Sequence, residues 1–205
     1  MILQKLEYII LPPKTGDLAT DVANLLRHNG REDTLTHVID VARVNGELAD
    51  RFGLVRDTCI AAGLLHDISA IIQPDDMMRY AIAGGFEICE AEHRFPFLLH
   101  QRFARMIASG YFEVEDRDIL SAVACHTSLR ASPTPCDMAL FIADKLAWDQ
   151  EGTPPYYDAV WSALDESLER ASYVFMTFVM DNGMLLYPHK DWTLAYEYLK
   201  GKLES

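Results

Sequence analysis

The sequence predicts an all-α fold, and three observations support this prediction. Apolar residues recur three and four positions apart through most of the chain, as in Val41, Val44 and Leu48, which is the spacing of one helix face. Proline, glycine and asparagine separate these periodic segments and mark where helices start and stop. After residue 12, no segment alternates apolar and polar residues as a half-buried strand does. We expect stacked helices rather than a regular four-helix bundle.

Residues 1–30 are predicted to form a short irregular N-terminal arm and a first helix. A short apolar run at residues 6–11 is broken by Pro12 and Pro13. A helical pattern then runs from Asp17 to about His28 and stops at Asn29-Gly30. Two roles for the arm stay open: it packs on the domain, or it mediates self-association as a homodimer.

Residues 31–205 are predicted to form the main helical domain. The helix that ends near residue 66 is apolar on every side, which is typical of a helix buried all round. The expected helices cover approximately residues 33–52, 56–66, 74–83, 96–109, 116–126, 135–148, 155–181 and 191–200.

The charge of the chain restricts its partners. The formal net charge is −13, so duplex nucleic acid, which attracts clustered lysine and arginine, is not an expected partner. A small anionic substrate remains compatible with this charge if a metal or a few placed cations supply local positive charge.

The expected compartment is the cytoplasm. No run of about 18 apolar residues without charge occurs, so no membrane span is predicted. The N-terminus lacks the pattern of a secretory signal. The four cysteines are widely spaced and form no Cys-x-x-Cys pair, so neither a zinc ribbon nor a thioredoxin-like motif is indicated, and a reducing cytoplasm is expected.

Four histidines and two aspartates share an unusual setting, because each stands on an apolar helix face. His37, for example, heads the stripe of Val41, Val44 and Leu48. The whole set is His37, His66, Asp67, His100, His126 and Asp144.

A single buried histidine is usually a core residue with hydrogen-bonded nitrogens, and Asp144 alone could pair with Lys145. One metal cluster explains all six residues together, since it needs neutral imidazoles and ionised carboxylates in a dry pocket. The other three histidines, His28, His93 and His189, fit ordinary helix ends, turns and surface positions.

The order of these six residues resembles that of the HD-domain metal-dependent phosphohydrolases. The segment Ala-Gly-Leu-Leu-His-Asp-Ile at 62–68 is similar to the signature of that superfamily. His126-Thr127 and Ala143-Asp144-Lys145 are similar to its YqeK-like branch. The resemblance covers approximately residues 31–190. It implies the HD-domain helical fold and hydrolysis of a nucleotide phosphoanhydride or phosphoester, with diadenosine tetraphosphate, cleaved to two ADP, as the leading substrate.

The resemblance also implies a cofactor of two divalent metal ions. Iron is the leading candidate, with manganese or another transition metal as alternatives. One ion would be held by His37, His66, Asp67 and Asp144, and the second by His100 and His126. Asp67 would bridge both, because two cations about 3.5–4 Å apart need a shared anion between them.

Further roles follow for residues near the predicted centre. Asp67 and Lys145 are the predicted catalytic residues, and Thr127, Lys145 and Arg130 are the predicted substrate contacts. Ordinary structural roles stay open for two of them: Lys145 can lie along its helix with its ammonium in solvent, and Thr127 can cap a helix end.

Two positions depart from the family pattern. Ala70 stands where the family often has a lysine, and Leu-Ala-Trp-Asp-Gln-Glu-Gly follows Lys145 where a Glu-Pro and an arginine are usual. Both departures remove cations near the expected polyphosphate, so they bear on specificity rather than on the metal chemistry.

Two other classes of function compete with the hydrolase. One is an oxygenase with a mixed-valent di-iron site, which consumes oxygen and releases no phosphate. The other is a nucleotide sensor that keeps the fold and the metals without turnover.

Overall fold

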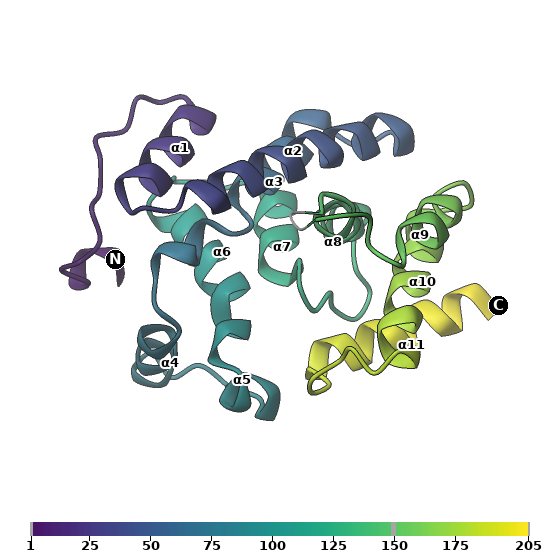
Figure 1. Cartoon of the computed structure of the whole chain (residues 1–205). Helices are drawn as coiled ribbons and strands as arrows, with labels where there is room; N and C mark the ends of the chain where they lie inside the picture. The colour runs from purple at the N-terminus through teal and green to yellow at the C-terminus, as the bar shows by residue number, and fades with distance from the viewer. Residues whose placement is uncertain (1, 149–150, 205) are drawn as a thin grey trace.

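The fold is all-helical, as predicted. The computed structural model describes residues 2–148 and 151–204, and within these ranges every regular element is a helix and no strand occurs. Figure 1 shows the helices stacked in several directions rather than aligned in one bundle.

Eleven α-helices and three short 3₁₀-helices are described in these ranges. The first half of the chain contains η1 (Ile2–Lys5), α1 (Leu18–His28), α2 (Glu32–Phe52), α3 (Arg56–Leu65), η2 (Ile68–Ile71), α4 (Pro74–Ala83), α5 (Glu90–Arg94), η3 (Pro96–Leu99) and α6 (His100–Gly110). The second half contains α7 (Arg117–Cys125), α8 (Pro135–Leu146), α9 (Tyr157–Ala163), α10 (Leu168–Asp181) and α11 (Lys190–Glu204).

The centre of the molecule is the packing of α2 and α3 against each other and against α8. Helices α6 and α7 pack together, and α7 also contacts α3 and α8. The C-terminal helices α9 to α11 lie to one side, with α10 packed on α8 (Figure 1). The backbones of α2 and α3 come very close at Gly63, where an added Cβ would lie 2.5 Å from Ala42 Cα. Only a residue without a side chain permits this approach.

The N-terminal arm packs on the domain, which is one of the two roles left open. Leu3, Leu6 and Ile9 are buried in the same apolar core as the helices. The hydroxyl of Tyr111 donates a hydrogen bond of 2.8 Å to the carbonyl of Pro12. The homodimer stays a prediction, as does the division of the chain at residue 30.

Most helix boundaries follow the residues that predicted them. Asp17 caps α1 by accepting a hydrogen bond from the Thr20 N–H at 2.9 Å, and Asp116 caps α7 in the same way. Gly53 ends α2 with a left-handed φ of 68°, a conformation that glycine adopts without strain.

The prediction of one helix over 155–181 is wrong. The structure has α9 and α10 there, separated at residues 164–167. Ser167 is fully extended, and its side chain accepts from the Arg170 N–H, so it starts a new helix.

The predicted helix at 96–109 also differs. Its first turn is the 3₁₀-helix η3, and α6 begins at His100. The short helix α5 at 90–94 was not predicted, because five residues are too few for a helical period to be recognised.

Within the described ranges, none of the helices has both the length and the apolar character required to cross a bilayer.

Candidate metal centre

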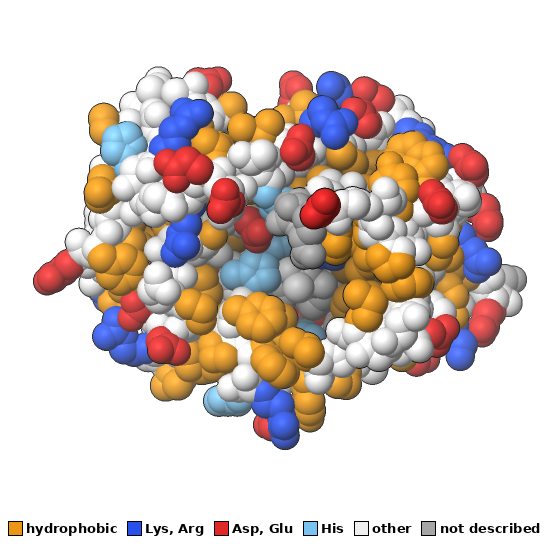
Figure 2. Space-filling model, viewed as in Figure 1, with side chains coloured by type: hydrophobic (Ala, Val, Ile, Leu, Met, Phe, Trp, Pro, Cys, Tyr) orange, Lys and Arg blue, Asp and Glu red, His pale blue; other side chains and the backbone are white. Residues whose placement is uncertain are grey.

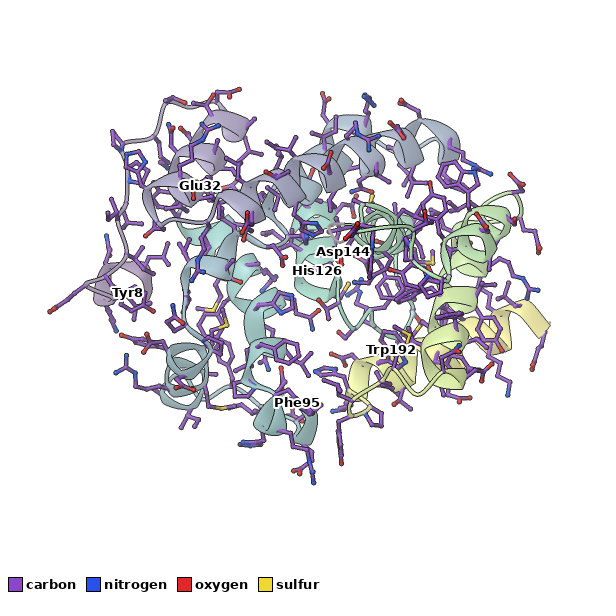
Figure 3. The ribbon with its side chains drawn as sticks, viewed as in Figure 1. Tyr8, Glu32, Phe95, His126, Asp144 and Trp192 are labelled. Atoms are coloured by element: carbon purple, nitrogen blue, oxygen red, sulfur yellow. The ribbon has the colours of Figure 1, made fainter. Side chains whose placement is uncertain are left out.

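All six predicted metal ligands meet at one place, beneath α2. His37 comes from the second turn of α2 and Asp144 from α8, while His100 is the first residue of α6. His66 and His126 directly follow α3 and α7. Figure 3 labels His126 and Asp144 close together at the centre of the molecule. Helix ends therefore supply most of the donors, where side chains can point along the helix axis into the gap.

The first group of donors consists of His37, His66, Asp67 and Asp144. The Nε2 of His37 lies 3.1 Å from Asp144 Oδ1 and 3.3 Å from the Nε2 of His66. The Nε2 of His66 also lies 3.5 Å from Asp144 Oδ1 and 3.6 Å from Asp67 Oδ2. These distances match the separation of donors that share one cation.

The second group consists of His100, His126 and the other oxygen of Asp67. The two Nε2 atoms lie 2.9 Å apart. Asp67 Oδ1 is 3.5 Å from the Nε2 of His100 and 3.3 Å from that of His126. Asp67 thus presents Oδ2 to the first group and Oδ1 to the second, and it is the residue common to both sets of potential ligands.

The backbone determines which ring nitrogen faces the centre. The Nδ1–H of His66 donates to the carbonyl of Gly63 at 2.7 Å, that of His100 to Phe97 at 2.7 Å, and that of His126 to Val123 at 2.9 Å. In a neutral imidazole the other nitrogen then carries a lone pair and no proton. Each of these three histidines therefore turns its Nε2 inward, where a neutral ring presents a lone pair.

This arrangement fits a bound cation. Two Nε2 lone pairs at 2.9 Å repel each other unless positive charge lies beside them. Hydrogen bonds from the other ring nitrogen to backbone carbonyls are the usual support of metal-bound histidines. The donors are imidazole nitrogens and carboxylate oxygens, which suit zinc, iron, manganese and similar metals.

The pKa values of the acids show that the centre keeps negative charge. Burial alone would raise the pKa of Asp67, yet His66, His126 and His100 hold that pKa well below its usual range. Burial also opposes ionisation of Asp144, but Lys145, His37 and His66 keep its pKa well below the ordinary value. Both carboxylates are therefore ionised at neutral pH.

The two most buried histidines respond in opposite directions. Burial lowers the pKa of His126 to about 4, which keeps its ring neutral. Burial also opposes charge on His66, but Asp67 and Asp144 raise the pKa of His66 to about 9. A positive charge beside these two carboxylates is strongly favoured, and a proton or a metal cation can supply it.

The centre opens to solvent on the side of Asp67 and His100. His66 and His126 are buried, whereas the Asp67 side chain is 30% exposed. Asp67 and His100 lie at the base of a cavity of about 420 Å³. Figure 2 shows histidine side chains near the middle of this face, surrounded by apolar and acidic residues.

The structure brings two of the three predicted substrate contacts to the centre. Lys145 Nζ pairs with Asp144 Oδ2, and Thr127 Oγ1 lies 3.0 Å from His100 Nε2. Arg130 lies elsewhere: its Nε donates to the buried carboxylate of Asp137 at 2.9 Å, and its side chain lines a different cavity. The loop after α7 turns Arg130 away from the metal ligands.

Three residues of the site were missed by sequence reasoning. Arg31 and Phe97 line the cavity with Asp67 and His100. Gln101 is buried, and its side-chain oxygen accepts from the N–H groups of Thr127 and Ser128. In the sequence, the only indication of this role is that Arg31 directly precedes the helix that carries His37.

The remaining histidines behave mainly as expected. His28 and His93 are exposed, and His28 Nδ1 bonds the Asn24 carbonyl of its own helix at 2.8 Å. His189 is instead buried just before α11, with its Nε2 3.8 Å from Glu92.

Comparisons with known proteins agree with this fold. The HD domain family model matches residues 34–149. An uncharacterised protein in the pepC 5′ region of Lactococcus lactis subsp. cremoris is 31% identical over 129 residues, covering 63% of this chain and 66% of that protein. The symmetrical bis(5′-nucleosyl)-tetraphosphatase of Bacillus subtilis (strain 168) is 26% identical over 170 residues, covering 82% of this chain and 90% of that enzyme.

The fold also matches a solved structure. A predicted HD superfamily hydrolase involved in NAD metabolism from Clostridium acetobutylicum superposes with a TM-score of 0.79 at 24% identity, covering 89% of this chain and 97% of that one.

The fold and the clustered histidines and aspartates define a hydrolase of the HD type. The chain belongs to the HD domain family, and its similarity to the Bacillus enzyme supports the YqeK-like assignment within that family.

Proposed function

We propose that this protein is a phosphohydrolase with a dinuclear metal centre that cleaves a nucleotide phosphoanhydride or phosphoester. The contact of the two Nε2 atoms of His100 and His126 at 2.9 Å is the observation that carries the proposal. The position of Asp67 favours two bound ions over one, because its two carboxylate oxygens face different donor groups. Iron is the leading metal, with manganese as an alternative, since imidazole and carboxylate donors suit both.

The charges of the centre favour an anionic substrate. Two divalent ions exceed the charges of Asp67 and Asp144 by two, so the centre is locally positive in a chain of net charge −13. Bound cations would lower the pKa of water towards neutrality and stabilise negative charge on phosphate oxygens. Asp67 and Asp144 stay ionised across the neutral range and so remain available as ligands.

Neighbouring side chains hold these ligands in position. The Lys145 ammonium pairs with Asp144 and keeps it ionised. Its other N–H groups can reach a phosphate, because an ammonium has three donors. Thr127 lies directly after His126, and its hydroxyl is 3.0 Å from His100 Nε2. With that nitrogen bound to a metal, the hydroxyl would be free to donate to the substrate instead.

The cavity above Asp67 suits a nucleotide. Phe97 is 46% exposed there and offers a face for a base. The Arg31 side chain lines the same cavity, and no hydrogen bond or ion pair joins it to the described residues; its Nε is buried without a partner. Arg31 would therefore supply the positive charge that is missing at Ala70, which lines the same cavity.

Diadenosine tetraphosphate, cleaved to two ADP, is the leading substrate. The similarity to the symmetrical tetraphosphatase of Bacillus subtilis supports this choice. The oxygenase and the nucleotide sensor remain the alternatives, and product analysis separates them. Oxygen consumption without phosphate release favours the first, and nucleotide binding without turnover favours the second.

The first test is a panel of phosphorylated nucleotides incubated with the iron- or manganese-loaded protein in ¹⁸O-labelled water. We expect cleavage of diadenosine tetraphosphate to ADP, with one labelled oxygen in one product. Asp67→Ala should lose bound metal and activity together, because it removes the ligand shared by both groups. Asp165→Ala is the matched control, since Asp165 is exposed and pairs with Arg51 on the surface, away from the metal centre. Full activity in Asp67→Ala would reject the mechanism.

The second test concerns Arg31. Arg31→Gln should raise KM for the polyphosphate about tenfold, the effect of one lost charge-assisted hydrogen bond, with a smaller change in kcat. Arg27→Gln, which removes an exposed arginine four residues earlier, controls for the loss of net charge. Equal KM values in the two variants would show that Arg31 does not contact the substrate.

A further inference from the structure

A second cavity, of about 690 Å³, lies between α6 and α7, and four arginines line it. They are Arg102 and Arg105 of α6, Arg117 of α7 and Arg130 of the following loop. We call this the arginine cavity. The chain has only 12 arginines and a net charge of −13, so this is an unusual concentration of positive charge. The arginine cavity shares no lining residue with the cavity above Asp67.

Two of the four arginines are held in place by the protein. Arg102 Nη1 donates to Glu92 Oε1 at 3.1 Å and to the Glu87 carbonyl at 2.9 Å, and its guanidinium lies 4.6 Å from the ring centre of Phe86. Arg130 Nε donates to Asp137, which is fully buried. A guanidinium has five N–H groups, so both arginines keep donors free of these contacts.

The other two arginines have no partner among the described residues. No hydrogen bond or ion pair joins the side chain of Arg105 or Arg117 to any residue in the described part of the chain. Among the described residues of the cavity wall, the one acid is Asp191. Ser121, also on the wall, has a buried hydroxyl without a hydrogen-bond partner. The cavity therefore presents donors and positive charge that the protein itself does not neutralise.

We propose that the arginine cavity is a binding site for a small phosphate-bearing anion, separate from the metal centre. Guanidinium groups bind phosphate through paired N–H donors, which an ammonium cannot match in geometry. Apolar side chains of Met106 and Leu120 share the wall with the arginines, so the site also accommodates an organic group attached to the phosphate.

The shape of the site favours a small molecule over an acidic peptide. Its wall is built from α6, α7, the Phe86 turn, the Arg130 loop and the first turn of α11. Its volume of about 690 Å³ is that of a small-molecule pocket, whereas a peptide needs a longer groove. The proposal does not depend on the hydrolase activity, because none of the metal ligands takes part.

The test is calorimetric titration of the full chain, treated with a chelator so that the metal centre contributes no phosphate affinity. Inorganic pyrophosphate, orthophosphate, AMP and adenosine are the probes, at low ionic strength. We expect pyrophosphate or AMP to bind and adenosine not to bind. AMP tighter than orthophosphate would identify a phosphorylated nucleoside as the ligand, and equal affinity would identify the phosphate group alone.

The variant Arg105→Gln/Arg117→Gln should weaken this binding about tenfold or more. Both side chains are exposed, so the fold should be retained. Arg43→Gln/Arg170→Gln removes the same charge from surface ion pairs elsewhere and serves as the control. An equal loss in the control, no loss in the cavity variant, or no binding to the unaltered chain would overturn the proposal. Tighter binding of a polyglutamate peptide than of pyrophosphate would also overturn it.

Discussion

Replacing Gly63 with alanine should force the two central helices apart. The added Cβ would lie 2.5 Å from Ala42 Cα and 2.8 Å from Ala42 N, whereas ordinary contacts begin at 3.4 Å. Backbone atoms cannot rotate away as side chains do, so α2 and α3 must separate by roughly the 0.9 Å difference between these distances. The carbonyl of Gly63 also accepts the Nδ1–H of His66, so the displacement should reach the metal centre.

The expected effect on stability is a balance of two terms. Overpacking of a close interface costs about 3 kcal/mol, and alanine is favoured over glycine in a helix by about 1 kcal/mol. We expect the free energy of unfolding to fall by about 2 kcal/mol, measured by urea denaturation, with weaker metal binding measured by equilibrium dialysis.

Gly201→Ala is the control for this experiment. Gly201 lies in α11, and an added Cβ would meet nothing within 4 Å. Its substitution should leave stability unchanged or raise it by up to about 1 kcal/mol. If Gly63→Ala behaved like Gly201→Ala, the close approach of α2 and α3 would not govern stability and the reasoning would be refuted.

Three further predictions concern charge. Burial alone would raise the pKa of Glu92, but His189, the Cys89 N–H and Arg102 lower this pKa to about 2. Because the pKa in the folded protein lies below the usual 4.5, ionised Glu92 stabilises the fold above pH 4.5. This stabilisation is lost as the pH falls towards 2. Glu92→Gln should therefore destabilise the protein at pH 7, by at most about 3 kcal/mol. The difference in urea midpoint between this variant and the unaltered protein should shrink below pH 4.5, and a difference that stays constant with pH would contradict the prediction. Chelation of the metal should lower the Tm, because bound metal stabilises only the folded state, and an unchanged Tm on reloading would argue against a metal centre. Ala70→Lys adds a cation beside Asp67 and should lower KM for polyphosphates. An unchanged KM would mean that the substrate does not contact the side of the cavity formed by Ala70.

The sequence predicted that these six side chains would lie together, because most of them stand on periodic apolar faces; their role as metal ligands stays a prediction. The stripe of Val41, Val44 and Leu48 is buried, and His37 at its head points where the period implied. The helical period predicts which way a side chain points from its own helix. Polar side chains that point inward from several helices indicated one shared centre.

Residues outside such faces could not be placed in this way. Arg31 precedes its helix and Arg130 lies in a loop, so no period fixed their directions; one lines the substrate cavity and the other points away from it. The break before α10 was missed because Ser167 interrupts an apolar pattern that continues in phase on both sides. The arginine cavity depends on how α6 and α7 pack together, which neither segment reveals alone.

The hydrogen bonds from three ring nitrogens to backbone carbonyls also bear on how the centre assembles. Each bond closes within four consecutive residues, at 63–66, 97–100 and 123–126. The choice of the nitrogen that faces the centre thus depends on local bonds at the end of each helical segment and needs no contact from a distant segment. Packing of the helices therefore brings together rings whose Nδ1 is already engaged by a backbone carbonyl, so Nε2 is the nitrogen that each ring offers to a cation.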